Sequence, residues 1–181
     1  MPAESEPVGA PGVDAAAGTR PRRATVLVAS TRASTGVYPD DTGPLIADWL
    51  ARRRFTERTL VVVADGPPFQ AALADAVGRQ WELILTTGGT GISPTDRTAE
   101  DTVTVLDYQI PGIAEEIRRV GAAKVPTAVL SRGVAGVAGR TLVVTLPGSK
   151  GGVKDGLAVL DGVLDHALDQ LAGGDHQRGS A

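Results

Sequence analysis

The stretch TTGGTGISPTDRT (residues 86–98) joins an apolar, strand-like run at 81–85 to a segment of helical character. Glycine lacks a Cβ atom, so the backbone N–H groups of this loop can approach a ligand closely. A loop between a strand and a helix favours an anion, because exposed N–H groups and a helix N-terminus both attract negative charge. Asp96 conflicts with a simple phosphate site, since a carboxylate repels a phosphate unless a cation lies between them. The stretch therefore predicts phosphate chemistry assisted by a metal ion.

The composition limits the functions that are open to the chain. Its 181 residues, 42% of them hydrophobic and 3% aromatic, suit one globular domain with an aliphatic core. A net charge of −3, from 18 Lys and Arg against 21 Asp and Glu, argues against a broad nucleic-acid-binding surface but allows a local basic pocket. With no cysteine and two histidines, the expected metal is a hard one bound by oxygen, such as Mg²⁺. No apolar stretch is long enough to span a bilayer, so we expect no membrane partner and a cytoplasmic protein.

We expect one domain over residues 24–172, between a disordered tail at 1–23 and a C-terminal tail at 173–181. The first 23 residues are rich in Ala, Pro, Gly and acidic residues and show no apolar periodicity. They also lack the basic start and hydrophobic run of a secretory signal.

Within this domain, apolar runs alternate with segments of helical spacing. Short apolar runs at 24–29, 59–64 and 141–146, like the run before residue 86, are typical of buried strands. We interpret 126–130 as a further strand, joined to 141–146 by a link too short for a helical crossover, which predicts an antiparallel pair. The order predicts a three-layer α/β/α domain with a mostly parallel sheet and one antiparallel edge strand.

The last helix is predicted to be long. It should begin after the turn at Gly148 and place a row of apolar side chains on one face. That row consists of Val153, Leu157, Leu160, Leu164, Leu168 and Leu171.

Four polar loops are predicted to follow parallel strands, beginning at Ser30, Asp65, Thr86 and Gly148. Ligands of such sheets bind at the carboxyl ends of the strands, so these loops should converge at one edge. Taken singly, the first loop fits a plain strand-to-helix turn, and Asp65 fits a turn or capping aspartate. Together, the two aspartates at 65 and 96 have the ligand type that Mg²⁺ accepts, with substrate phosphates completing its coordination. The residues alone predict a Mg²⁺-dependent site for a phosphorylated ligand, suited to phosphoryl or nucleotidyl transfer.

Several motifs in order resemble a known family. The run at 86–98 is similar to the signature of the molybdenum-cofactor biosynthesis family that includes the Mog and MoaB proteins, the molybdopterin adenylyltransferases. The likeness extends over about residues 24–174 and includes S-x-R-A-S-x-G-V-Y from Ser30, L-S-R-G-V-A-G from Leu130 and L-P-G-S from Leu146. T-T-G-G-T-G alone would also fit relatives such as the molybdate insertion domain and the competence-damage-type domain.

The resemblance implies a molybdopterin-binding fold, usually trimeric. It implies that the terminal phosphate of molybdopterin attacks the α-phosphate of MgATP, giving adenylylated molybdopterin and pyrophosphate, with hand-over of the product to a molybdate insertion protein. Carried over by position, Asp96 and Asp65 are the catalytic and Mg²⁺-binding residues. The substrate-binding residues implied in the same way are Thr87, Gly88, Gly89, Thr90, Gly91, Gly148, Ser149, Ser30, Arg32, Ser131 and Arg132.

The chain departs from the family pattern at a few positions. Thr31 stands where relatives often have Asp and Gly66 where Glu is common, so a secondary metal contact would be absent. Thr145 replaces a frequent Asn, and Lys150 replaces a frequent Pro. Lys150 is either an added phosphate contact or an exposed lysine with no part in the site. Two other functions stay open: a non-catalytic pterin-binding or scaffold protein of the same pathway, and a nucleotide pyrophosphatase of a related family.

Overall fold

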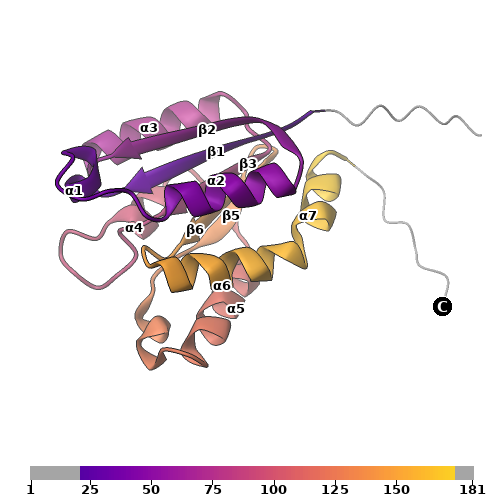
Figure 1. Ribbon diagram of the computed structural model, residues 1–181. Helices are drawn as coiled ribbons and strands as arrows, with labels where there is room; N and C mark the ends of the chain where they lie inside the picture. Colours follow the sequence, from indigo (N-terminus) through magenta and orange to yellow (C-terminus); the bar gives the residue numbers. More distant parts are fainter. Residues whose placement is uncertain (1–20, 174–181) are drawn as a thin grey trace, which may run out of the picture.

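The computed structural model describes residues 21–173, which form a sheet with helices on both faces (Figure 1). The predicted tails fall almost entirely outside this range. Within it, the first strand already begins at Arg22, two residues earlier than the expected start of the domain.

The sheet has six strands in the order β2-β1-β3-β6-β5-β4. Strands β2, β1, β3 and β6 run parallel, whereas β5 pairs antiparallel with both β6 and the short β4. This confirms the prediction of a mostly parallel sheet with an antiparallel edge. The strands are β1 (Arg22–Ala29), β2 (Phe55–Val63), β3 (Leu83–Thr87), β4 (Tyr108–Gln109), β5 (Ala135–Ala138) and β6 (Thr141–Leu146).

The helices fill the connections between these strands. They are α1 (Thr31–Ser34), α2 (Gly43–Arg52), α3 (Pro67–Gly78), α4 (Thr98–Val103), α5 (Pro111–Ala122), the 3₁₀ helix η1 (Pro126–Leu130), α6 (Lys150–Asp161) and α7 (Leu164–Leu171).

On α5, two hydrogen bonds from Arg119 hold the pKa of the exposed Glu116 carboxyl below its ordinary value.

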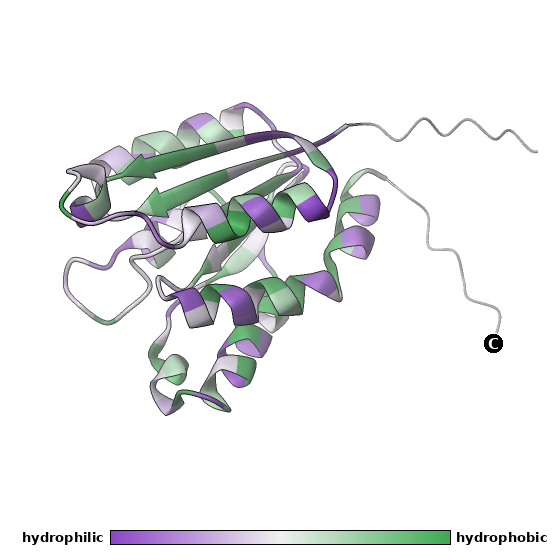
Figure 2. Cartoon of the chain, in the orientation of Figure 1, coloured by the Kyte–Doolittle hydropathy of each residue, from purple (hydrophilic) through white to green (hydrophobic). Residues whose placement is uncertain are grey.

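Two hydrophobic layers hold the helices to the sheet. Successive side chains of a strand point to opposite faces, so Leu83 and Leu85 pack under α2, α6 and α7 while Ile84 packs under α3. Figure 2 shows β1 and β2 as hydrophilic where they begin and hydrophobic towards their arrowheads, and the surrounding helices as striped, with one hydrophobic and one hydrophilic side. The core is therefore aliphatic, as the composition predicts.

The prediction of a strand at 126–130 was wrong. These residues form η1, which begins at Pro126 and leaves Val129 and Leu130 exposed, so they have no sheet edge against which to pair. The antiparallel partner of β6 is β5, which lies inside the segment expected to be a link. Tertiary pairing rather than local apolar content decided which residues became the strand.

The long helix predicted from 153 to 171 is two helices. The chain turns at Gly162 and Val163, whose N–H groups bond three residues back, to Val159 and Leu160, instead of four. Glycine weakens a helix interior, and three-residue bonds tighten its last turn. The apolar row nevertheless faces the core from both helices. No helix in the described part of the chain is long and apolar enough to cross a membrane.

The aliphatic core makes a testable prediction at Leu85, which is fully buried in β3. Leu85→Ala should lower the free energy of unfolding by about 2–5 kcal/mol, because it removes apolar contacts and leaves a cavity. Leu60→Ala on the edge strand β2, where the side chain is 42% exposed, should cost less than about 1 kcal/mol. Urea denaturation of both variants measures the difference; equal losses would contradict this assignment of core and edge.

Candidate functional site

The C-terminal ends of four parallel strands lie level at one edge of the sheet. In the ladder Ala29 pairs with Val63, Val28 with Thr87, and Thr87 with Leu146. The loops that follow these strands therefore start side by side, as the sequence predicts. They carry Ser30, Asp65, the 88–97 loop and Gly148.

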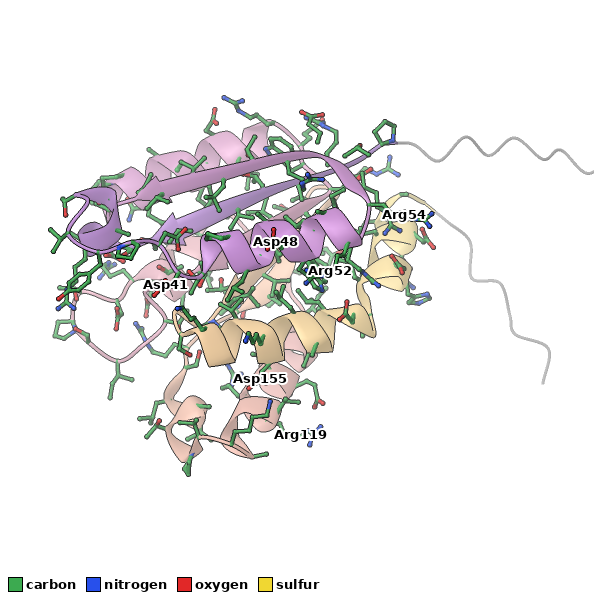
Figure 3. All side chains as sticks on the ribbon, viewed as in Figure 1. Asp41, Asp48, Arg52, Arg54, Arg119 and Asp155 are labelled. Carbon is green, nitrogen blue, oxygen red and sulfur yellow. The ribbon has the colours of Figure 1, made fainter. Side chains whose placement is uncertain are left out.

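A cavity of about 290 Å³ opens between three of these loops. Four residues predicted as substrate-binding line it, and two aspartates from the segment before α2 complete its rim. Figure 3 labels one of these two, Asp41, at the start of α2. The four predicted residues are Ser30, Thr87, Gly88 and Gly148, and the two aspartates are Asp40 and Asp41. The volume is at the low end of what small-molecule sites occupy, about 300–1,000 Å³.

Backbone contact between Gly88 and Gly148 holds two of the loops together. Gly88 has a φ of +90°, and a Cβ atom there would collide with the carbonyl oxygen of Ala29. A Cβ on Gly148 would lie 3.1 Å from the Cα of Gly88. The buried hydroxyl of Thr87 adds a 2.8 Å hydrogen bond to the carbonyl of Pro147. Thr87 thus fixes the loops to each other, and its hydroxyl is already occupied.

The carboxylate of Asp65 is anchored on one side and open on the other. One oxygen, Oδ2, accepts hydrogen bonds from the backbone N–H of Thr31 at 3.0 Å and from its hydroxyl at 2.8 Å. The other, Oδ1, lies 3.3 Å from the point that a Cβ on Gly89 would occupy. Thr31 therefore orients the carboxylate of Asp65.

Asp96 lies against the same loop. Its Oδ2 accepts a 3.3 Å hydrogen bond from the N–H of Ser93 and lies 2.6 Å from the Cβ position of Gly91. Asp65 and Asp96 thus flank the segment from Gly89 to Gly91, and each keeps one oxygen without a hydrogen bond among the described residues.

The donor set fits Mg²⁺ only with help from a substrate. Across residues 21–173 no group of three or more His, Cys, Asp and Glu residues is placed to hold a metal ion. Mg²⁺, however, is commonly bound by one or two carboxylates together with substrate phosphates and water. Two carboxylate oxygens beside a glycine loop match that arrangement.

The side chain of Arg132 is hydrogen-bonded to the glycine loop. Its Nε donates to the carbonyl of Gly91 at 2.7 Å, and its other nitrogens donate to the carbonyl of Asp96 and to the carboxylate of Glu100. Its backbone N–H donates to the carbonyl of Thr90 at 2.8 Å. The guanidinium is thus committed to positioning the loop; substrate binding by Arg132 stays a prediction that this geometry does not favour.

The remaining predicted residues have local roles. The hydroxyl of Ser149 caps α6 by accepting from the N–H of Gly152 at 3.1 Å, and that of Ser131 accepts from Gly133 at 3.4 Å. Arg32 lies on the exposed helix α1, with its guanidinium 6.0 Å from the ring centre of Tyr38. Lys150 is exposed but pairs with Asp41 at 3.2 Å, across the rim of the cavity.

Asp40 was missed by the sequence reasoning. Its Oδ1 accepts from the N–H groups of Thr42 and Gly43, both at 3.0 Å, and so caps α2 beside the cavity. Its Oδ2 is buried and has no hydrogen-bond partner among the described residues. Aspartate two or three residues before exposed N–H groups is a turn and cap signal, but Asp41 carries nearly the same signal one position later.

A buried contact between Gln70 and Asp101 was also missed. Asp101 is 4% exposed, and its Oδ1 accepts a 2.8 Å hydrogen bond from Nε2 of Gln70, while Oδ2 has no partner in the described chain. This bond joins α3, which follows Asp65, to α4, which follows Asp96. The helix dipole favours an acidic residue in the first turn of any helix. Nothing in the sequence therefore distinguished the buried Asp101 from an exposed acidic residue at such a position.

Comparison with known proteins identifies the relatives of this chain. A family model described as a probable molybdopterin binding domain matches residues 25–166. The Mog protein of Mycobacterium ulcerans, a molybdopterin biosynthesis protein of solved structure, is 59% identical, with a TM-score of 0.82 over 86% of this chain and 99% of that one.

Two curated relatives carry the comparison further. A molybdenum cofactor biosynthesis bifunctional protein of Synechococcus elongatus is 40% identical over 84% of this chain and 48% of its own length. The molybdopterin adenylyltransferase of Haemophilus influenzae is 36% identical over 80% of this chain and 74% of its own. The chain spans about half the length of the bifunctional relatives that it matches.

The hydrogen bonds of the Arg132 guanidinium predict that replacing it by lysine loosens the 88–97 loop. Arg132→Lys should lower the free energy of unfolding by about 1–2 kcal/mol, because one ammonium cannot reproduce three directed contacts. Amide hydrogen exchange at residues 88–97 should quicken more than in the strands. Arg32→Lys, at an exposed arginine whose guanidinium has no hydrogen bond to any described residue, is the control and should change neither quantity. Unaltered exchange in Arg132→Lys would mean that the backbone alone holds the loop.

Proposed function

Because this chain belongs to the family of probable molybdopterin binding domains, we propose that it adenylylates molybdopterin in molybdenum cofactor biosynthesis. An oxygen of the terminal phosphate of molybdopterin attacks the α-phosphorus of ATP. A new P–O bond forms as the bond to the β-phosphate breaks, and pyrophosphate leaves. Relatives named molybdopterin adenylyltransferase support this reaction. The structural observation that carries it is the placement of Asp65 and Asp96 on either side of the glycine loop.

The chain's own residues supply position and charge. The N–H groups of residues 88–91 donate to phosphate oxygens, since glycines let the backbone approach them. Thr31 and Ser93 fix the carboxylates of Asp65 and Asp96, so these need no rearrangement during the reaction. The cavity lined by Ser30 and Gly148 holds the adjoining part of a substrate.

The open oxygens of Asp65 and Asp96 are the proposed Mg²⁺ ligands. The ion would neutralise the phosphates and reconcile the two carboxylates with an anionic substrate. The hydroxyl of Thr31 holds Asp65 in the orientation that leaves its other oxygen open for the ion.

The experiment that tests the function supplies molybdopterin and MgATP and measures pyrophosphate together with adenylylated molybdopterin. Asp96→Asn should lower turnover by about 100-fold or more, because the amide keeps the shape but removes the charge beside the transferring phosphate. Asp48→Asn, at an exposed position of α2 (Figure 3), is the matched control and should retain full turnover.

Three results would count against this proposal. Pterin binding without pyrophosphate release from the unmodified chain would favour a non-catalytic binding protein. Cleavage of ATP in the absence of molybdopterin would favour a nucleotide pyrophosphatase. Near-normal turnover of Asp96→Asn would remove that carboxylate from the mechanism.

We propose in addition that the chain forms a trimer and passes its product to a molybdate insertion protein. Exposed apolar side chains on and beside η1, among them Val125, Val129 and Leu130, suit contact between copies. Sedimentation at micromolar concentration should then give a mass about three times the 18.5 kDa of one chain. Val129→Glu should shift the mass towards that of the single chain, whereas Val37→Glu, at a similarly exposed position in the loop after α1, should not. A concentration-independent mass of one chain would contradict the trimer.

A further inference from the structure

A second hollow lies at the opposite edge of the sheet. It has a volume of about 520 Å³, and we call it the arginine cleft after four of its lining residues, Arg22, Arg52, Arg53 and Arg54. Arg22 begins β1, and the other three end α2 and start the turn into β2. Figure 3 shows Arg52 and Arg54 at the end of α2 that lies beside α7. Because β1 and β2 are parallel, this edge is the far end of the strands from the glycine loop.

The charges of the arginine cleft are only partly balanced. Asp165 is shared by two arginines, with Oδ1 2.6 Å from Arg22 and Oδ2 3.3 Å from Arg53. Arg53 also pairs with Oδ1 of Asp161 at 3.6 Å, so two carboxylates face four arginines. The guanidinium groups of Arg52 and Arg54 have no hydrogen bond or ion pair with any residue that the structure describes. The cleft thus gathers four of the chain's 18 Lys and Arg residues, in a chain whose net charge is −3.

The helix dipole accounts for part of this arrangement only. Cations at the C-terminal end of α2 are favoured by that dipole, but its effect does not extend beyond the last turn. It does not explain why β1 contributes Arg22, whose guanidinium is also 5.9 Å from the ring centre of Phe55. Nor does it explain why the arginines surround a hollow instead of projecting separately into solvent.

Arg54 is also held in an unfavourable backbone conformation. Its φ is +63°, in the left-handed region, at the position after the helix cap where glycine is the usual residue. A long charged side chain at this position raises the conformational energy of the turn. Gln80 after α3 has a similar φ of +54° and lies outside the arginine cleft, so it provides a matched reference.

We propose that the arginine cleft binds a small molecule with at least two linked phosphate groups. Planar guanidinium groups bind phosphate oxygens in pairs, and several of them favour a ligand of high negative charge. A single phosphate would occupy Arg52 and Arg54, whereas a second is needed to draw Arg22 and Arg53 away from Asp165. Among the described residues that line the cleft, four carry a positive charge and Pro21 alone is an apolar residue, which favours an anionic ligand. The volume is ample for such a ligand.

This site is separate from the proposed adenylylation. A ligand in the arginine cleft is beyond reach of Asp65 and Asp96, which lie at the other end of the strands. Both ATP and free pyrophosphate carry linked phosphates, so either of them could supply the group that the arginine cleft would bind. A role in sensing either of them would act through β1 and α2, which connect the two edges.

Nuclear magnetic resonance tests the proposal with inorganic pyrophosphate, without Mg²⁺ and at low salt. The Nε–H signals of Arg22, Arg52 and Arg54 should shift with one saturable affinity, which orthophosphate should show at least about tenfold more weakly. ATP in a second titration should shift the same signals if the nucleotide is a ligand, and its adenine should add no contacts. Because the probe contains no pterin, failure of the adenylylation assay would leave this result standing.

Arg54→Gly is the decisive variant, because it removes the charge while making the backbone conformation more favourable. It should weaken pyrophosphate binding at the arginine cleft by about tenfold, equivalent to about 1.4 kcal/mol, and leave thermal stability unchanged or raised. Gln80→Gly makes the same backbone change elsewhere and should bind like the unmodified chain. Both variants should keep full adenylylation activity.

Each contrary outcome overturns the proposal. Absence of shifts at the arginine signals, or unchanged affinity in Arg54→Gly, would show that the arginines are solvated charges only. Equal affinity for orthophosphate and pyrophosphate would remove the requirement for linked phosphates. If Arg54→Gly shifted signals of residues 1–20 without any added phosphate, the occupant would be the chain's own acidic segment, which contains Glu4, Glu6 and Asp14.

Discussion

The register of the parallel ladder is the constraint on which the rest of the structure depends. Strands β1, β2, β3 and β6 end level with one another, so their loops start at the same height above the sheet. A shift of one residue in any pair would turn that strand's side chains to the other face and move its loop. The two hydrophobic layers prevent this in β1, β3 and β6, since each of these strands has buried apolar side chains on both faces. Residues from distant parts of the chain can therefore form one site without a loop being long.

At the carboxyl ends of these strands, local contacts fix the polar groups of the candidate site. Gly88 and Gly148 allow two backbones to touch, and Arg132 fixes the carbonyl groups of the loop that carries Asp96. Thr31 does the equivalent for Asp65. The result is a pair of carboxylates whose positions are determined before any ligand binds, which is the condition under which fixed charges are most effective in phosphoryl chemistry. The same parallel order places the starts of β1 and β2 and the end of α2 at the other edge, where arginines gather.

Most of the fold could be predicted from the sequence because its elements have strong local signals. Continuous apolar runs marked β1, β2, β3 and β6, and helical spacing marked α2, α3 and α5. The failures share a cause. Residues 126–130 have apolar, β-branched content but meet no free sheet edge. In contrast, β5 is a strand because it pairs with β6, and β4 because it pairs with β5. Gly162 divides the last helix, although the apolar row continues across it. Pairing partners are a property of the whole chain and leave little trace in a short segment.

The sequence by itself determined the class of fold, the edge at which the polar loops gather, and the family, because these follow from periodicity and from glycine and aspartate at set places in the chain. Only the tertiary structure decided what each polar side chain does there. Arg132, expected to bind substrate, has its donors directed to the loop, whereas Asp40 and Asp101 were not distinguished at all. It also decided that Arg22 joins the arginines of α2 around a hollow. The physical reason is that a hydrogen bond or ion pair between distant residues forms or fails on differences in distance of a few tenths of an ångström. Only the folded backbone defines those distances.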